Sequence, residues 1–468
     1  MARQIAMVPG APPLSLLQGL SSFVAASSPA YLGRETLRDL KMRILDSLGC
    51  AIGAQSAEVV RAVRAQVENF GGRPVASLIG GGQTSPAHAA LYNGALIRYL
   101  DFNDSYLAAG ETSHPSDCLG AVLAAAEYRN AGGDELLTAL AVAYEVQCRL
   151  SDVAPVRHRG FDHTTLVAYA AAAGVARALA LDEQHTANAI AIAGTALNAL
   201  RVTRTDALSH WKGLAAPFAA FGATWAAFLA ARGITGPPGV LDGRKGFAES
   251  IAGSFHIDWS TGKLDSVRLT AVKKFNAEVH AQSAIEALIE LSSEHRLAPD
   301  DILSVDIATF DVAYNIIGGG DDGCKTVVKT KEDADHSLPY LAAVALLDGR
   351  VLPKQFDPSR IVSEDVQSLL SRVTVYAKPD FTRRFPKEHC CRVRVHLRNG
   401  SFLECSKQDY EGMPSRPMSW AAVEEKFEGL SDPVASPNLR SELIDAVRHL
   451  EHIKTSELTS LLSRVRTN

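Results

Sequence analysis

The chain has 468 residues, of which 47% are hydrophobic and 21% charged, and its formal net charge is −5. This length is typical of a protein with two to four domains, and the composition is that of a globular protein with a large core. The small, mixed charge gives no reason to expect a surface that binds nucleic acid or membranes.

The cysteines are scattered along the chain and form no CxxC pair, which argues against a disulfide framework, a zinc site or a conventional iron–sulfur cluster. We therefore expect a reduced, cytoplasmic protein without a metal or cofactor. The apolar stretch 14–25 is broken by polar residues, so it indicates a secretory signal only weakly. We expect no apolar span of 18 residues. The seven cysteines are Cys50, Cys118, Cys148, Cys324, Cys390, Cys391 and Cys405.

Helical patterns dominate the first half of the chain. Leu37, Leu40, Ile44 and Leu48 recur at helical spacing. Many of the predicted helices are rich in Ala and Gly, which lets helix axes approach closely, so we expect a compact all-α bundle. The triplet 80–82 is interpreted as a turn, since no Walker lysine follows these glycines. Further helices are predicted over 59–70, 118–127, 135–150, 164–181, 184–199 and 214–231.

The pattern changes after about residue 257. Residues 302–310 alternate as a strand does, 373–376 are β-branched and aromatic, and 391–405 form two strands around Asn399-Gly400. After Met418 the pattern is helical again. We predict a mainly α protein with a large, discontinuous all-α domain built from both chain ends and a smaller α+β lid domain. The predicted parts are 1–262 (helical), 263–411 (α+β lid) and 412–468 (C-terminal helices that pack back). Between the strands, helices are predicted over 280–293, 336–347 and 363–370.

The chemistry-bearing residues begin with Asp101, Asp104 and Ser105, between two predicted core helices. The two aspartates are three positions apart and would share a helical face if the first helix continued. An aspartate paired with His114 would orient the imidazole and raise its basicity, as general acid–base catalysis requires. Alternatively, one of the aspartates caps a helix.

His114, His163 and Lys212 each precede a predicted helix. A cation is unfavourable at a helix N-terminus unless an anion is also bound there, so the three together indicate a pocket for an anionic ligand. The alternative is two neutral histidines and a solvated lysine. Arg201 and Arg204 could clamp carboxylates bidentately or form ordinary surface salt bridges.

Lys273, Lys274 and His280 lie in the segment that joins the two predicted domains, where ligand clefts usually occur. His336 and Tyr340 begin a helix of the second domain and are candidate lid residues.

The segment LDFNDSYLAAGETSHPSDCLG resembles the DFNDTW…HPSD signature of the MmgE/PrpD family. The resemblance covers essentially the whole chain, through LDSLGCAIGA, NGALIRYLDFND, SHWKG, FNAEVHAQSAIEA and DADHSLPYLAAVALL. Members of this family include 2-methylcitrate dehydratases, cis-aconitate decarboxylases and an iminodisuccinate epimerase. The resemblance implies a cleft between a helical domain and a lid, and usually a homodimer.

By position, the resemblance implies catalytic roles for Asp101, His114, His163, Lys212 and His280. Departures from the family pattern concern the substrate: Asn276 replaces a proline, Ser105-Tyr106 replaces Thr-Trp, and the loop before His114 is one residue longer. Together with the residue patterns above, the predicted substrate-binding set is Asp104, Ser105, Arg201, Arg204, Lys273, Lys274, His336 and Tyr340.

These features predict a cofactor-independent, metal-independent lyase that dehydrates a small tricarboxylate such as 2-methylcitrate, as in propionate catabolism. His114 or Asp101 would be the base or its partner, and His163 or His280 would protonate the leaving hydroxyl. Alternatives within the family are a cis-aconitate-type decarboxylase and an epimerase of amino or hydroxy dicarboxylates. An alternative of another class is a non-catalytic, anion-binding helical protein.

Overall fold

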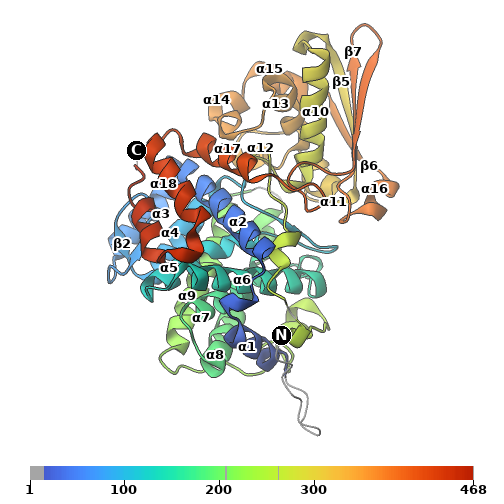
Figure 1. The fold of residues 1–468 in the computed structure, drawn as a ribbon. Helices are drawn as coiled ribbons and strands as arrows, with labels where there is room; N and C mark the ends of the chain where they lie inside the picture. Colours follow the sequence, from blue (N-terminus) through green and yellow to red (C-terminus); the bar gives the residue numbers. More distant parts are fainter. Residues whose placement is uncertain (1–14, 206–207, 262, 467–468) are drawn as a thin grey trace.

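The structure, a computed structural model, describes residues 15–205, 208–261 and 263–466. The predicted fold class is confirmed: the protein is mainly α, with a smaller α+β part (Figure 1). The first helices are α1 (Leu16–Ala26), α2 (Arg34–Gly53), α3 (Glu58–Phe70), α4 (Pro86–Tyr99), α5 (Leu119–Tyr128), α6 (Gly133–Val153), α7 (Thr164–Ala178), α8 (Glu183–Ala196) and α9 (Trp211–Ala230). Two short hairpins lie among them: β1 (Ala76–Ser77) with β2 (Gln83–Thr84), and β3 (Tyr106–Leu107) with β4 (Thr112–Ser113).

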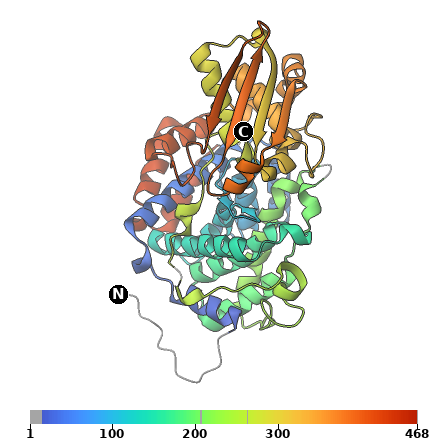
Figure 2. The same cartoon turned by 90° about the vertical axis from the view of Figure 1, so that its right-hand side faces the viewer.

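The α+β part contains the four-stranded sheet, in the order β6-β5-β7-β8. Strand β5 pairs parallel with β6 and antiparallel with β7, and the predicted hairpin around Gly400 is confirmed as β7 and β8. Figure 2 shows these strands upright above the helical part. The strands are β5 (Ile302–Thr309), β6 (Val373–Ala377), β7 (Cys391–Leu397) and β8 (Phe402–Lys407). The helices are α10 (Gln282–His295), α11 (Asp311–Ala313), α12 (Lys331–Ala334), α13 (Leu338–Asp348), α14 (Pro358–Ile361), α15 (Glu364–Leu370) and α16 (Pro379–Arg384).

The chain ends in α17 (Trp420–Ser431), α18 (Pro437–Arg448) and α19 (Thr455–Leu462). Helices α17 and α18 pack against α2 and α19 packs against α5, so the C-terminal helices lie on the helical part formed by the first half of the chain (Figure 1). The buried hydrophobic residues form two large clusters: one draws on residues 17–272 and 418–465, the other on residues 275–395. These clusters support the division of the chain into a discontinuous helical domain and a lid, which we retain as a proposal.

The condition attached to one local prediction, that the helix before Asp101 continues, is not met. Helix α4 ends at Tyr99, and Asp101 has a φ of 55°, in the left-handed region that Asp tolerates better than most residues. The helix therefore does not continue, and Asp101 and Asp104 do not share a helical face. Because of this turn, the carboxylates of Asp101 and Asp104 contact different residues.

Helix α9 also departs from expectation. By length and composition it is apolar enough to cross a membrane, although we expected no such span. More than half of it is buried within the protein, which is what a core helix also shows. The helix begins at Trp211, so Lys212 lies inside its first turn rather than before it.

Candidate functional site

The site is centred on the carboxylate of Asp101, which the turn after α4 buries among cationic side chains. Its Oδ1 accepts hydrogen bonds from Arg98 Nη1 at 2.6 Å and Lys273 Nζ at 2.8 Å, and its Oδ2 lies 3.6 Å from Lys212 Nζ. Burial favours the neutral acid, but Arg98, Lys273 and Lys212 outweigh burial and hold the pKa of Asp101 well below its usual value. Asp101 is therefore ionised.

Lys212 reaches across to the α+β part. Its Nζ lies 2.6 Å from Oδ1 of Asp335 and 2.9 Å from Nδ1 of His336. The other oxygen of Asp335 pairs with Lys331 Nζ at 2.7 Å. Burial lowers the pKa of Lys212, although Asp335 and Asp101 oppose that shift. Arg98, Asp101, Lys212, Lys273, Asp335 and His336 are called the Asp101 cluster below.

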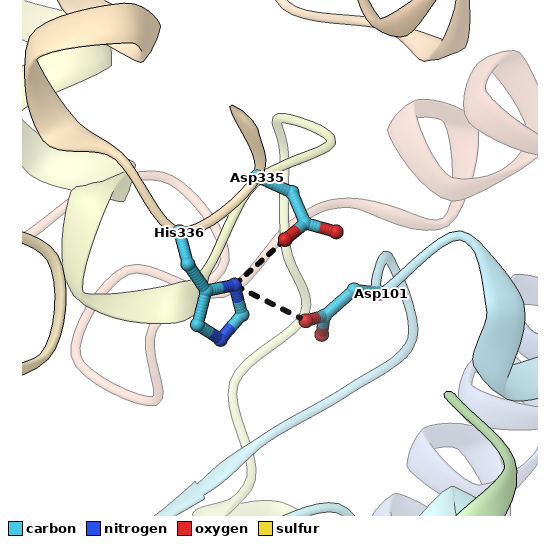
Figure 3. A group of neighbouring side chains, drawn as sticks. All are labelled: Asp101, Asp335 and His336. Carbon is cyan, nitrogen blue, oxygen red and sulfur yellow. Dashed lines mark hydrogen bonds and ion pairs between the residues drawn. The ribbon is translucent and has the colours of Figure 1, made fainter. Parts of the chain in front are cut away.

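Figure 3 shows that Asp101, Asp335 and His336 converge, with His336 Nδ1 2.7 Å from Asp335 and 3.9 Å from Asp101. Two carboxylates and an imidazole this close could ligate a metal ion. However, the Lys212 ammonium contacts the same group of atoms and already supplies a positive charge there. The arrangement is thus one of carboxylates around a lysine.

His114 lies beside this cluster with a defined tautomer. Its Nδ1 is 2.7 Å from the backbone oxygen of Asp104 and 3.1 Å from Oγ of Ser105. A carbonyl oxygen only accepts, so Nδ1 carries the proton and Nε2 carries a lone pair. Burial, with Arg98 and Lys273 nearby, holds the pKa of His114 well below its usual value, so the ring is neutral. A neutral ring with a lone pair on Nε2 has the form of a general base.

His163 forms a pair with His114. The two rings lie 5.3 Å apart between centroids, edge to face. Burial lowers the pKa of His163 to about 3 even though Asp162 lies 3.4 Å from its Nδ1. Its Nε2 is buried and makes no hydrogen bond within the described part of the chain. That nitrogen is available to a ligand.

Arg201 and Arg204 both engage carboxylates of the protein itself. Arg204 Nε donates to Asp162 at 2.7 Å, while Arg201 Nη2 donates to Asp322 at 3.1 Å. Arg204 Nη2 is buried and has no hydrogen-bond partner among residues 15–205, 208–261 and 263–466. Arg204 therefore keeps a donor for a ligand, whereas Arg201 links the helical part to the α+β part.

His280 has a separate carboxylate partner. Its Nδ1 lies 2.7 Å from Oε1 of Glu278, and its Nε2 lies 3.5 Å from Oγ1 of Thr112 on β4. Burial opposes ionisation of Glu278, but His280 lowers its pKa to about 2. Since the Glu278 carboxylate accepts from Nδ1, the Nε2 side of the His280 ring faces Thr112.

Three predicted substrate-binding residues have other partners. Asp104 is fully buried and accepts from Ser116 Oγ and Tyr144 OH, both at 2.7 Å. Lys274 pairs with Glu411 at 2.6 Å. The hydroxyl of Tyr340 donates to the backbone oxygen of Gln355 in the buried core. These contacts give no support to a binding role for Asp104, Lys274 or Tyr340, and of the two neighbouring lysines only Lys273 contacts Asp101.

A small pocket lies against Asp101 and Lys212. Its wall contains three cations, Arg98, Lys212 and Lys331, and two carboxylates, Asp101 and Glu332, so the cations outnumber the acidic groups. Its remaining lining residues are Tyr99, His210 and Gly213.

The sequence reasoning missed five charged residues that organise the site. Arg98 carried a usable signal, because it lies three positions before Asp101 at a helix end, where opposite charges pair. Glu278 and Asp162 lie within two positions of the histidines that they contact. No sequence signal could place Asp335 and Lys331 against residues more than 100 positions away.

Comparison with known protein families identifies two matching domain models. The MmgE/PrpD N-terminal domain matches residues 18–260, and the MmgE/PrpD C-terminal domain matches residues 275–452. A 2-methylcitrate dehydratase of Escherichia coli (strain K12) is 30% identical over 361 residues, 72% of this chain and 73% of that protein. An alkylcitrate dehydratase phiI of a fungal species is 31% identical over 84% of this chain and 83% of that protein. The human cis-aconitate decarboxylase is 26% identical over 96% of this chain and 94% of that protein.

Proposed function

The chain belongs to the MmgE/PrpD family, and from this premise we propose that it is a lyase that removes water from a small tricarboxylate of the 2-methylcitrate type. The similar proteins named 2-methylcitrate dehydratase and alkylcitrate dehydratase support this reaction. One observation carries the proposal: a ring of buried cations around Asp101 lies beside a neutral His114 whose Nε2 carries a lone pair.

The proposed reaction breaks a C–H bond next to a carboxylate and the neighbouring C–O bond, forms a C=C bond and releases water. Nε2 of His114 takes the proton from carbon. Negative charge then develops on the adjacent carboxylate, and the cations of the Asp101 cluster stabilise that charge. Elimination also needs a proton for the leaving hydroxyl.

We assign that proton to Lys212 rather than to His163 or His280. A general acid works best when its pKa lies near the working pH, and burial lowers the pKa of Lys212 towards that range. Burial lowers the pKa of His163 to about 3, so His163 is neutral, and His280 pairs with Glu278 outside the Asp101 cluster. Lys273 and Arg204 would hold the carboxylates of the substrate.

Decarboxylation of a cis-aconitate-type acid is the second candidate, because the human decarboxylase matches 96% of this chain. Both reactions use the same cations. They are separated by incubating the protein with citrate, 2-methylcitrate and cis-aconitate, and following each acid and any released carbon dioxide by NMR.

The main proposal expects loss of 2-methylcitrate with one alkene product, and abolished turnover in the His114→Ala variant. Equal turnover by that variant would remove His114 from the mechanism. A Lys245→Met variant is the surface control, since the Lys245 side chain is exposed and its ammonium pairs with Glu249. Full activity in EDTA is expected for a reaction without metal or cofactor; activity lost in EDTA and restored by added metal would contradict it.

We also propose that the protein is a cytoplasmic homodimer that acts in propionate catabolism. Exposed aromatic side chains along one face of α9 support an oligomer: Trp211, Phe218 and Trp225 are 46%, 45% and 56% exposed. A reducing compartment is supported by the seven cysteines, which are all described and all unpaired.

A further inference from the structure

The last helices of the chain touch the candidate site through one buried residue, Lys426 on α17. Helix α17 lies close to α2 because Gly49 and Gly53 of α2 have no side chains. A Cβ atom at Gly49 would lie 3.2 Å from the Cα atom of Phe427, and one at Gly53 would lie 3.3 Å from the backbone oxygen of Leu430. These glycines thus set the depth at which α17 packs.

At that depth the Lys426 side chain is only 6% exposed, and its ammonium has one carboxylate and two carbonyl partners. Nζ lies 2.6 Å from Oδ1 of Asp46 on α2, 2.8 Å from the backbone oxygen of Phe102 and 2.9 Å from the backbone oxygen of Lys273. It also lies 3.6 Å from the centroid of the Phe102 ring, a cation–π contact. The ammonium therefore donates to carbonyls of two different segments and also forms an ion pair with Asp46.

Those two segments carry the central ion pair of the Asp101 cluster. Phe102 directly follows Asp101, and the Lys273 side chain donates to both the backbone oxygen and the carboxylate of Asp101, at 2.6 and 2.8 Å. A neighbouring contact also holds the segment that contains Lys273: Arg43 on α2 donates to the backbone oxygen of Thr270 at 2.7 Å. Side chains of α2 and α17 thus form hydrogen bonds with the backbone next to both Asp101 and Lys273.

We propose that Lys426 is a positioning residue for the reaction: its ammonium clamps the Phe102 and Lys273 carbonyls and so fixes the Asp101 carboxylate against the Lys273 ammonium. Lys426 lies behind the backbone and does not touch the substrate. Small displacements of catalytic groups are costly, so loss of the clamp lowers turnover even when the protein stays folded. The activity readout of this inference rests on the proposed function, so a second readout that needs no substrate is included.

The test must avoid leaving Asp46 as an unpaired buried charge, which would by itself destabilise the protein. The parent is therefore the Asp46→Asn variant of the full chain, in which a neutral amide replaces the buried carboxylate. Lys426→Gln is added to this parent to keep one donor, and Lys426→Met to keep none. All three proteins are compared at a temperature at which thermal melts show them folded.

We expect kcat to be highest in the Asp46→Asn parent, lower in its Lys426→Gln derivative and lowest in its Lys426→Met derivative. The kcat of the Lys426→Met derivative should be at least tenfold below that of the parent. Hydrogen exchange followed by mass spectrometry should show faster exchange only in peptides that cover residues 101–106 and 270–275. Equal kcat in folded parent and Met derivative would overturn the inference. If the wild type turns over none of the acids tested, the proposed function fails, and the exchange data alone decide: unchanged exchange in both segments overturns the clamp.

Discussion

Lys212 of α9 and Asp335 at the end of α12 form a buried ion pair of 2.6 Å between residues 123 positions apart. The pair joins the first helices of the protein to the α+β part, directly beside the pocket. Asp335 is also held by Lys331, and burial alone would raise the pKa of Asp335, but the two lysines lower it well below its usual value. The carboxylate therefore stays charged and anchors the Lys212 ammonium next to Asp101.

Replacing Lys212 with Met should abolish most of the activity, because the proposed proton donor is lost. The expected fall in kcat is about 100-fold to 10,000-fold, the usual contribution of general acid catalysis. Steady-state assays of the 2-methylcitrate reaction measure it. Lys245→Met, which removes an exposed lysine, should leave kcat within about twofold. A folded Lys212→Met protein with wild-type kcat would exclude the assignment.

Arg201 should stabilise the folded protein through its ion pair with Asp322 rather than bind the substrate. The side chains form a mostly buried pair at 3.1 Å, 15% and 9% exposed. In a double-mutant cycle of Arg201→Gln and Asp322→Asn, unfolding in urea should give a coupling free energy of about 0.5–3 kcal/mol, as for contacting residues. If the two effects on stability simply add while Arg201→Gln alone raises KM, Arg201 clamps the substrate instead.

Glu111 should make the protein less stable as the pH rises towards neutrality. Burial, with Asp162 nearby, raises its pKa to about 7, although its Oε2 accepts from the backbone N–H groups of Val156 and Arg157. Because the pKa of Glu111 is higher in the folded than in the unfolded protein, the stability that the protonated Glu111 side chain contributes is complete below pH 4.5, the pKa of an unperturbed glutamate. That contribution is lost as the pH rises through about 7.

The Glu111→Gln variant should therefore be more stable than the wild type above pH 7, by up to about 3 kcal/mol, since one pKa unit corresponds to about 1.4 kcal/mol. Thermal melts between pH 5 and pH 8.5 provide the comparison. Glu364→Gln, at an exposed glutamate, should follow the wild-type curve. Parallel curves for wild type and Glu111→Gln would show that Glu111 titrates normally.

Trp225→Glu should convert a homodimer into monomers if the exposed aromatic face of α9 is the interface. A charge in the middle of an apolar interface costs several kcal/mol of association free energy. Light scattering after size-exclusion chromatography gives the mass. Phe402→Glu is the matched control, because Phe402 is 53% exposed but lies on β8 of the α+β part. A dimer that survives Trp225→Glu places the interface elsewhere.

Local pattern was enough to predict the class of fold and most elements. The alternation in 302–310 and Asn399-Gly400 predicted the strands β5, β7 and β8, since side-chain period and turn chemistry are local properties. The left-handed turn at Asp101 was not predicted, because helical spacing continued through it. Tertiary packing of the carboxylate among Arg98, Lys212 and Lys273 holds the chain in that conformation.

For the site, the sequence predicted the residue types but not their pairing. His114, His163 and Lys212 do lie at helix starts, as the capping patterns indicated. Whether a charged side chain faces the pocket or another buried charge depends on contacts between distant segments. Asp104, for example, is held by Tyr144, 40 positions away, which no spacing rule reveals.

The contact of α17 with Gly49 and Gly53 has a consequence for how the protein is made. The ribosome synthesises the α+β part before α17, so the sheet has all its strands while the Asp101–Lys273 pair still lacks Lys426. The large helical cluster includes residues 418–465, so its core is complete only after this last part of the chain has been made. A premature stop before α17 would thus leave the sheet with all its strands and the Asp101–Lys273 pair without Lys426.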